Sequence, residues 1–148
     1  MRYIWLACLL TATSCSLFNE FNVRPFQYTA HDSAYTISLQ VPKGYASKKA
    51  ITDSAGNQMQ FYYYKDGTLF YAAHMQDTAY RSIDTSRHIP LPHPDDGLIY
   101  KGLKDGLYWR EIRLNNGLVY GYGKVPKANE ITFDRAVDFS SLQKLDAK

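Results

Sequence analysis

A turn between two aromatic segments is the feature that most constrains how this chain can fold. Residues 58–64 and 68–76 are rich in Tyr, Phe and other strand-forming residues, and Lys65-Asp66-Gly67 separates them. An Asp-Gly turn flanked by such segments is a strong local signal for a β-hairpin. We therefore predict that the domain is built around a hairpin formed by these two strands.

The register of this hairpin depends on the turn. A two-residue Asp-Gly turn would place Tyr63 opposite Phe70 and mix aromatic with polar side chains on both faces. A three-residue loop, closed by a left-handed Gly67, instead collects one apolar face, formed by Met59, Phe61, Tyr63, Leu69, Tyr71, Ala73 and Met75. A one-residue slip moves every side chain to the other face, so burial of one coherent face should select the register. We predict the three-residue loop.

The opposite face of the hairpin is too aromatic for a solvated surface, because it carries Tyr62, Tyr64 and Phe70 together with His74. We expect the chain's own helix or a partner to cover it, and these four residues are candidate binding residues. If the helix covers them, the next candidates for an exposed contact surface are Trp109, Glu111 and Arg113, on a later strand, or the Pro-rich loop. Trp and Arg are enriched in interface hot spots.

Other segments extend the sheet. Apolar and polar residues alternate over Ala34–Val41, and residues 98–125 contain two further turns, which is typical of an antiparallel meander. Residues 16–32 end in a possible edge strand near Phe26–Thr29. In contrast, Pro90, Pro92 and Pro94 predict that residues 77–97 form an extended connection rather than sheet.

A helix is expected at the C-terminal end, with Thr132 as its N-cap. Gly121 and Gly123, on one face of the last strand, would let this helix lie close across the sheet. Tyr, which favours sheets, accounts for 13 of the 148 residues. The fold class we predict is α+β: an antiparallel twisted sheet of about six strands with a C-terminal helix packed on one face.

The N-terminal residues have the pattern of an export signal. Arg2 precedes a short apolar run, residues 3–10, and Thr11-Ala12-Thr13-Ser14-Cys15 follows it. This string resembles the lipobox of bacterial lipoproteins, with Ala12 where that pattern prefers Leu. The resemblance implies cleavage before Cys15 and attachment of lipid to its thiol. The alternatives are an ordinary secretory signal that leaves Cys15 free, or a short anchor helix that is never cut.

Cysteine usage agrees with this interpretation. Cys8 lies inside the signal and Cys15 is the only other cysteine, so the processed chain has no disulfide and no cysteine metal site. The predicted organisation is a lipoprotein signal peptide (1–14), a lipidated tether with a possible edge strand (15–33) and a single α+β domain (34–148). The resemblance places the protein in the cell envelope, membrane-anchored by lipid on Cys15, on the periplasmic or surface-facing side.

A second resemblance concerns residues 35–45, Tyr35-Thr36-Ile37-Ser38-Leu39-Gln40-Val41-Pro42-Lys43-Gly44-Tyr45. This alternating strand, which runs into Pro-x-Gly-aromatic, resembles the opening strand of PsbP-like domains. That resemblance implies a central antiparallel sheet flanked by helices, in domains that bind or assemble more than they catalyse.

Candidate catalytic or metal-binding groups are few. His88, His93, Asp95 and Asp96 are close in sequence and suit zinc chemically, but no rigid element is predicted to hold them. His74 lacks an identifiable partner, and adjacent His31 and Asp32 suit a turn. We therefore predict no catalytic residues, no metal and no cofactor.

The function predicted from the sequence is a lipid-anchored, extracytoplasmic binding or assembly module of a bacterial envelope that is not an enzyme. Its partners would be the membrane and a protein of the envelope. The net charge of +3 is spread along the chain and gives no footprint for nucleic acid. The alternatives are a domain that binds a glycan or other small molecule through an aromatic sheet face, and a hydrolase that uses His74, or His88 with Asp95 or Asp96.

Overall fold

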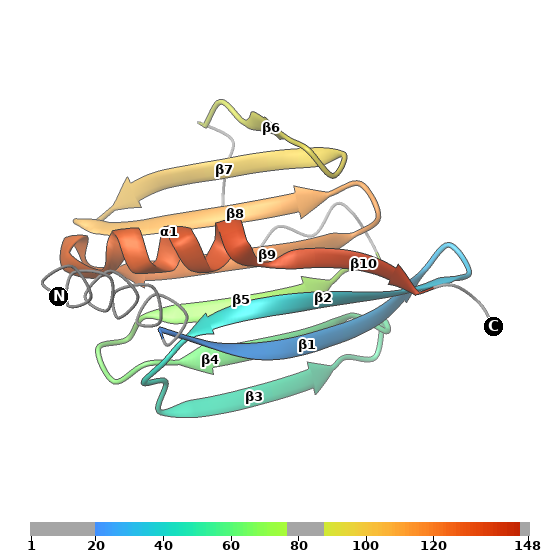
Figure 1. Ribbon diagram of the computed structural model, residues 1–148, viewed down its shortest axis with the longest axis horizontal. Coiled ribbons are helices and arrows are strands. Elements are labelled where there is room, and N and C mark those ends of the chain that lie inside the picture. The colour runs from blue at the N-terminus through green and yellow to red at the C-terminus, as the bar shows by residue number, and fades with distance from the viewer. Residues whose placement is uncertain (1–19, 77–87, 146–148) are drawn as a thin grey trace, which may run out of the picture.

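The computed structural model describes residues 20–76 and 88–145, which form two antiparallel sheets and one helix (Figure 1). The larger sheet has seven strands in the order β3-β4-β5-β9-β8-β7-β6, and the smaller has three in the order β1-β2-β10. The strands of the larger sheet are β3 (Ser47–Thr52), β4 (Gln58–Tyr63), β5 (Leu69–His74), β6 (Leu91–His93), β7 (Gly97–Lys104), β8 (Leu107–Leu114) and β9 (Leu118–Val125). The smaller sheet contains β1 (Phe21–Ala30), β2 (Ser33–Pro42) and β10 (Ser141–Leu145), and helix α1 spans Glu130–Phe139.

The central hairpin has the predicted register. Phe61 of β4 lies opposite Tyr71 of β5, and Lys65-Asp66-Gly67 forms the three-residue loop. Gly67 has a φ of +85°, the left-handed conformation that such a loop requires. The Asp66 carboxylate accepts a hydrogen bond from the Thr68 backbone N–H at 2.9 Å and so stabilises the turn.

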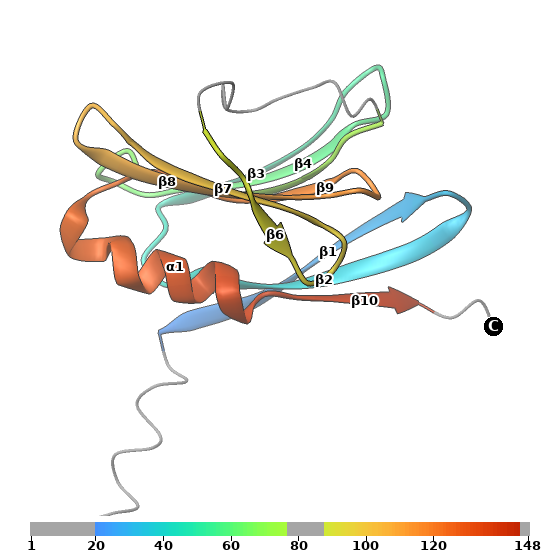
Figure 2. The same ribbon diagram turned by 90° about the horizontal axis from the view of Figure 1, so that it is seen from above.

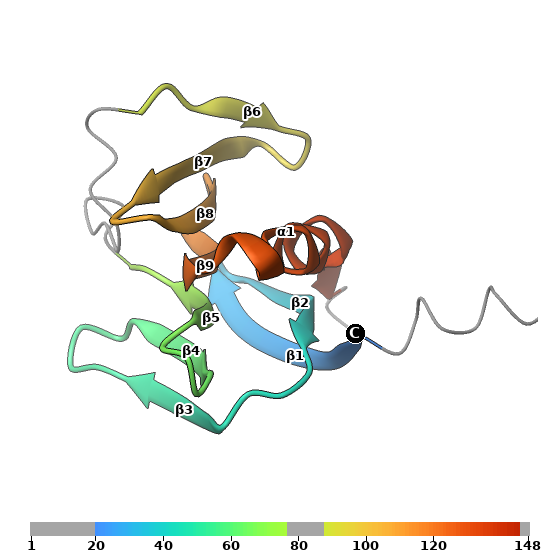
Figure 3. The same ribbon diagram turned by 90° about the vertical axis from the view of Figure 1, so that its left-hand side faces the viewer.

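The smaller sheet and α1 form a second layer against one face of the larger sheet (Figures 2 and 3). The main core lies between these layers. It includes the side chains of Ile37 and Leu39 from β2, Tyr62 and Phe70 from the hairpin, and Tyr122 from β9, all buried. The aromatic face of the hairpin is therefore covered, as predicted, by the chain itself. Phe133 of α1 lies over it, with its ring centroid 5.2 Å from that of Tyr64, 5.7 Å from Tyr122 and 6.4 Å from Phe70.

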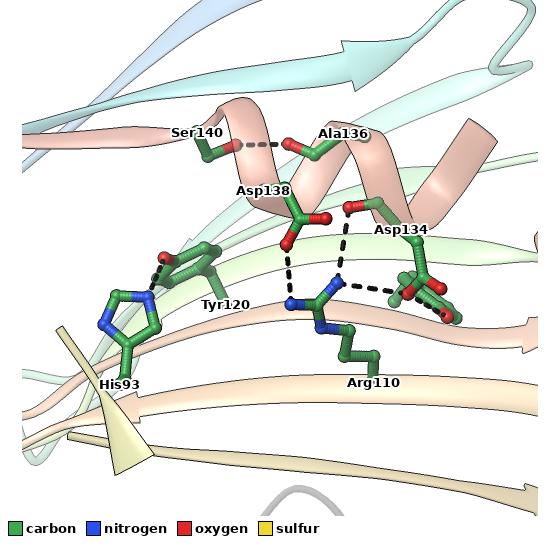
Figure 4. A network of polar contacts seen from close by, with 8 residues as sticks. His93, Arg110, Tyr120, Asp134, Ala136, Asp138 and Ser140 are labelled. Atoms are coloured by element: carbon green, nitrogen blue, oxygen red, sulfur yellow. Dashed lines mark hydrogen bonds and ion pairs between the residues drawn. The ribbon is translucent and has the colours of Figure 1, made fainter. Parts of the chain in front are cut away.

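A half-buried arginine joins α1 to the larger sheet (Figure 4). The guanidinium of Arg110, on β8, pairs with Asp138 at 2.7 Å and with Asp134 at 3.2 Å. Asp134 also accepts a hydrogen bond from the Tyr122 hydroxyl at 2.9 Å. Burial alone would lower the pKa of Arg110, but Asp138 and Asp134 outweigh it and raise the pKa. Arg110 therefore stays charged, and its two ion pairs connect the helix to the sheet.

Several predictions need correction. The described residues form ten strands, not about six, in two sheets rather than one. β6 pairs with β7 within the segment predicted to lie outside the sheet, and its Pro92 is tolerated because β6 is an edge strand. β1 starts five residues before the predicted edge strand and runs to Ala30.

The C-terminal end also differs from the prediction. The helix begins at Glu130, after a short 3-10 turn (η2, Lys127–Asn129), rather than after Thr132. It ends at Phe139, and β10 then pairs with β2. Moreover, α1 does not cross Gly121 and Gly123: it packs on the face of β9 that carries Tyr122, and alternation along the strand directs both glycines to the opposite face.

Candidate functional site

The outer face of the seven-stranded sheet, opposite the main core, contains a groove of about 840 Å³. Its apolar lining comes mainly from the face of the hairpin that is not covered by α1. The groove is lined by Met59, Phe61, Tyr63, Gly67, Leu69, Tyr71, Ala73, Met75, Lys104, Asp105, Leu107, Trp109, Glu111, Arg113, Val119, Gly123 and Lys124. It thus crosses β4, β5, β9 and β8, and we call it the outer groove.

The groove has open space over Gly123 of β9, which has no side chain. Gly123 lies beside Leu69 of β5, and a Cβ added at Gly123 would meet no atom within 4 Å. The pairing of β8 with β9 also shifts between Tyr108 and Arg110, so Gly123 and Lys124 together face Trp109. Lys124 adopts a φ of +58°, as the extra residue of such a bulge can. Bulges of this kind often re-aim side chains beside binding sites.

A buried acid lies at the base of the groove. Glu111 of β8 has no exposed surface, and its carboxylate accepts a hydrogen bond from the Tyr71 hydroxyl of β5. The two strands are separated by β9, and the residue between Tyr71 and Glu111 is Gly121. Because Gly121 has no side chain, the tyrosine can reach across β9 to the carboxylate.

Arg113 balances the charge of Glu111. Its Nε lies 2.6 Å from Glu111 Oε1, and its guanidinium stacks over the Tyr100 ring at 4.6 Å. A carboxylate buried among apolar side chains is tolerated only when it is paired and hydrogen-bonded, and Glu111 has both kinds of partner. The base of the groove is therefore polar but electrically balanced.

Trp109 forms one wall of the outer groove. Its indole lies against Gly102 of β7, where an added Cβ would be 2.9 Å from the ring. The His88 imidazole packs edge-on against the same indole, with ring centroids 4.8 Å apart. Trp109 is thus held from two sides, and its orientation is fixed before any ligand enters.

Three charged residues surround the end of the groove nearest the β7–β8 turn. Lys104, Asp105 and Lys124 are all exposed there. Two ammonium groups against one carboxylate give this end a small positive balance. The rest of the lining is mostly Met, Leu, Val, Ala and aromatic residues, so the groove is amphipathic along its length.

The binding residues predicted from the sequence lie on both sides of the sheet. Tyr62, Phe70 and His74 are buried in the main core and offer no surface to a ligand. The Tyr64 hydroxyl donates to the Pro42 carbonyl at 2.6 Å, and burial raises the pKa of that tyrosine. In contrast, Trp109 and Arg113 both line the outer groove. Cys15, the predicted lipidation site, lies outside the described residues.

The histidines considered for catalysis or zinc have separate environments. His74 stacks on Tyr28 with ring centroids 4.8 Å apart, and burial lowers its pKa. His93 accepts a hydrogen bond from the Asp95 backbone and lies 3.5 Å from the Tyr120 hydroxyl, while His88 packs on Trp109. Within residues 20–76 and 88–145, no three His, Cys, Asp or Glu side chains are placed to share a metal ion.

The turn predicted at His31-Asp32 is present. Both residues have positive φ, 49° and 60°, and they connect Ala30 with Ser33 in a tight hairpin. A general base held by its neighbour is therefore not formed at this position.

Sequence reasoning missed Phe61, Leu69 and Tyr71 as residues of a site, whereas it named Glu111, with Trp109 and Arg113, as a candidate contact residue. The predicted register placed the three hairpin residues on one face, which we expected to be buried, and Tyr71 and its neighbours Ala73 and Met75 are indeed buried there. What the prediction did not include is a groove over the same face. The sequence signal that could have indicated these residues is the presence of two apolar faces on a single hairpin, because one helix and one small sheet can cover only one of the two faces.

Comparison with known proteins finds no matching family model, no similar curated protein and no similar solved structure. The class that the structure establishes is therefore architectural: a mostly antiparallel β domain, broadly α+β, with two sheets and one C-terminal helix. Among the described residues, no helix has the length and apolar character needed to cross a membrane.

Proposed function

We propose that this protein is a lipid-anchored, extracytoplasmic binding module that holds a small, mostly apolar molecule in the outer groove and does not catalyse a reaction. The observation that carries the proposal is the groove itself. Its volume of about 840 Å³ lies within the range of roughly 300–1,000 Å³ that small-molecule sites occupy. Such sites are lined mainly by apolar and aromatic side chains with a few fixed polar groups, which describes this groove.

The shape of the groove indicates where the body of the ligand would lie. The open space over Gly123 is flanked by Leu69 on one side and Trp109 on the other. An apolar group placed there would bury its surface against side chains on both walls, and each buried CH₂ contributes about 0.8 kcal/mol. A chain-like or flat apolar body fits this space without displacing a side chain.

The charges indicate which head group the ligand would carry. Glu111 is already balanced by Arg113 and hydrogen-bonded by Tyr71, so it does not favour a cation. The exposed end has Lys104 and Lys124 against Asp105 alone. A neutral or anionic head group is therefore favoured over a cationic one. The glycan hypothesis depended on Tyr62, Tyr64 and Phe70, which belong to the covered face, and it does not transfer to the groove.

The anchor in this proposal comes from the lipobox-like string that ends in Cys15. More than one acyl chain is needed for stable attachment, and lipoprotein modification supplies it. This part is tested separately by the mass of the protein extracted from membranes, with Cys15→Ser as the variant that should leave the membrane fraction.

Binding in the groove can be followed through Trp109, because Trp5 is the only other tryptophan. With Trp5→Phe in place, the exported protein is titrated with N-phenyl-1-naphthylamine, an apolar dye that accepts energy from tryptophan. We expect energy transfer from Trp109 to bound dye. Oleate should displace the dye at lower concentration than oleylamine, because the two share an apolar chain and differ in head-group charge.

Gly123→Leu tests the location. Gly123 does not have a positive φ and has open space above it, so a leucine can be accommodated while it fills the groove. We expect dye affinity to fall about tenfold or more, a change of about 1.4 kcal/mol. Ser47→Leu adds the same side chain at an exposed strand position outside the groove and should leave affinity unchanged. Equal binding by both variants, with unchanged thermal midpoints, would contradict the proposal.

A further inference from the structure

Exposed apolar side chains gather on the second layer, on the side away from the larger sheet. Ile131 and Phe139 of α1 are 73% and 56% exposed, and Val23 of β1 is 60% exposed. The Phe21 ring packs edge-on against Phe139 with centroids 6.3 Å apart, and the Arg135 guanidinium lies 5.9 Å from the first ring and 5.7 Å from the second. We call these five residues the outer patch.

The spacing of these residues explains why they share one side. Ile131, Arg135 and Phe139 recur every four residues, so they form one stripe along α1. The buried residues of α1, Phe133, Ala136 and Val137, belong to the opposite side. Phe21 and Val23 are two apart in β1 and so lie on the same face of that strand. The contact between Phe21 and Phe139 joins the strand to the stripe.

The charged side chains beside the outer patch are held in ion pairs. Strands β1, β2 and β10 contain no Asp or Glu. The acids that border the patch have partners: Asp134 and Asp138 pair with Arg110, and Glu20 pairs with Arg135 at 3.0 Å. The patch therefore combines large apolar side chains with a guanidinium, a composition typical of residues that lie at a bilayer interface.

The predicted anchor at Cys15 lies close in the sequence to the start of β1 and therefore to the outer patch. Glu20 lies only five positions after Cys15 and immediately precedes Phe21. At about 3.3–3.6 Å per residue, this stretch spans at most about 18 Å. An acyl chain on Cys15 would thus hold the start of β1 close to the membrane, whichever way the rest of the domain turns.

We propose that the outer patch rests on the bilayer that carries the lipid of Cys15. The inference depends on the proposed anchor but not on the groove ligand. Figure 2 shows that α1 and the smaller sheet lie on one side of the larger sheet. The groove residues belong to the other face of that sheet. With the patch on the membrane, the outer groove opens away from the membrane and stays accessible.

Depth-dependent fluorescence tests this orientation. The full chain is exported and purified, and its mass is used to confirm that residues 1–14, which contain Cys8, are removed and that Cys15 is acylated. The processed chain then contains no other thiol. A cysteine is introduced by Ile131→Cys in the patch or, as a control, by Lys104→Cys at the groove rim, and is labelled with an environment-sensitive fluorophore. Both positions are exposed, so neither change should disturb folding. The labelled proteins are placed in phosphatidylethanolamine and phosphatidylglycerol vesicles with or without brominated acyl chains.

We expect brominated lipid to reduce the emission of the label at position 131 at least about twofold and to leave the label at position 104 unchanged. Equal quenching at the two positions, or quenching at position 104 alone, would overturn the proposal while leaving the anchor intact. Self-quenching of the label at position 131 that rises with protein concentration in detergent would show that a second copy of the chain covers the outer patch. This result would also overturn the proposed contact with the bilayer. An unacylated Cys15 would refute the anchor and the orientation together, but not the binding of dye in the groove.

Discussion

Replacement of Arg113 by methionine should destabilise the domain through the acid that it leaves behind. Glu111 has no exposed surface, and Arg113 is the cation at 2.6 Å from its carboxylate. Removing one partner of a buried ion pair costs about 3–5 kcal/mol, because the remaining charge stays buried. The side chain of Arg113 is 16% exposed at the groove, so some water can replace it. We therefore expect a loss of about 3 kcal/mol, at the lower end of that range.

Replacing the other partner of the ion pair, Glu111, should lower the free energy of unfolding by less. In Glu111→Leu the remaining charge is that of Arg113, which borders the groove and can reach water. The double variant, Glu111→Leu with Arg113→Met, removes both charges and replaces them by apolar groups, a change that is often close to neutral. We expect it to be at least about 2 kcal/mol more stable than Arg113→Met alone, since it lacks the buried carboxylate that has lost its guanidinium partner.

Urea unfolding followed by Trp109 fluorescence measures these differences, provided that the dependence of the free energy on urea concentration is the same in all variants. Lys101→Met is the matched control, because it removes an exposed basic side chain from the neighbouring strand and should change stability by no more than about 0.5 kcal/mol. The reasoning fails if Arg113→Met costs no more than Lys101→Met, or if the double variant loses the sum of the two single losses.

Three further predictions follow from the core and the sheet. Phe133→Ala should lower the free energy of unfolding by about 3–5 kcal/mol, because its ring fills the space between α1 and the larger sheet, whereas Phe139→Ala, at an exposed site, should change it far less. Burial lowers the pKa of His74, so the unfolded chain binds more protons than the folded chain at mildly acidic pH. The free energy of unfolding should therefore fall as the pH drops from about 6.5 towards the folded pKa. Urea midpoints at pH 7.5 and 5.5 should show this fall, and His74→Phe should make it smaller. Gly121→Ala should destabilise the sheet markedly in thermal melts, because its Cβ would lie 2.0 Å from the Arg110 carbonyl oxygen; an unchanged midpoint would contradict this.

Local patterns were sufficient to predict the hairpin and the meander. The register between β4 and β5 follows from Lys65-Asp66-Gly67 and from alternation in the flanking strands, and the structure confirms it. The same signals predicted β2 and the strands from β7 to β9. These features depend on residues that are near in sequence, which is why composition and turn chemistry were enough.

The missed elements depend on distant partners. Ser141–Leu145 contains too few apolar residues to show a strand period, and it becomes β10 because Leu142 lies beside Ile37 of β2. β6 has a proline at its centre and pairs only because β7 offers an edge. The lipid anchor remains a prediction, since Cys15 lies outside the described residues.

The candidate site was predicted only in part. Trp109 and Arg113 were selected for their residue types, and both line the groove. Glu111 was placed on the same face of its strand, but nothing in the sequence showed that Tyr71 would reach it across Gly121. That contact requires three strands to be adjacent in the order β5-β9-β8, which is a property of the sheet and not of any one segment.

The sequence by itself determined that one hairpin would carry two apolar faces, because side chains alternate along a strand and the three-residue loop sets their register. Only the tertiary structure decided which face became the core and which became the groove. Exposing either face to water costs free energy, so hydrophobicity alone does not choose between them. Phe133 and the β1-β2-β10 sheet pack on Tyr62, Phe70 and Tyr122, so this face belongs to the main core. Phe61, Leu69 and Tyr71 lie on the other face, where they line the outer groove.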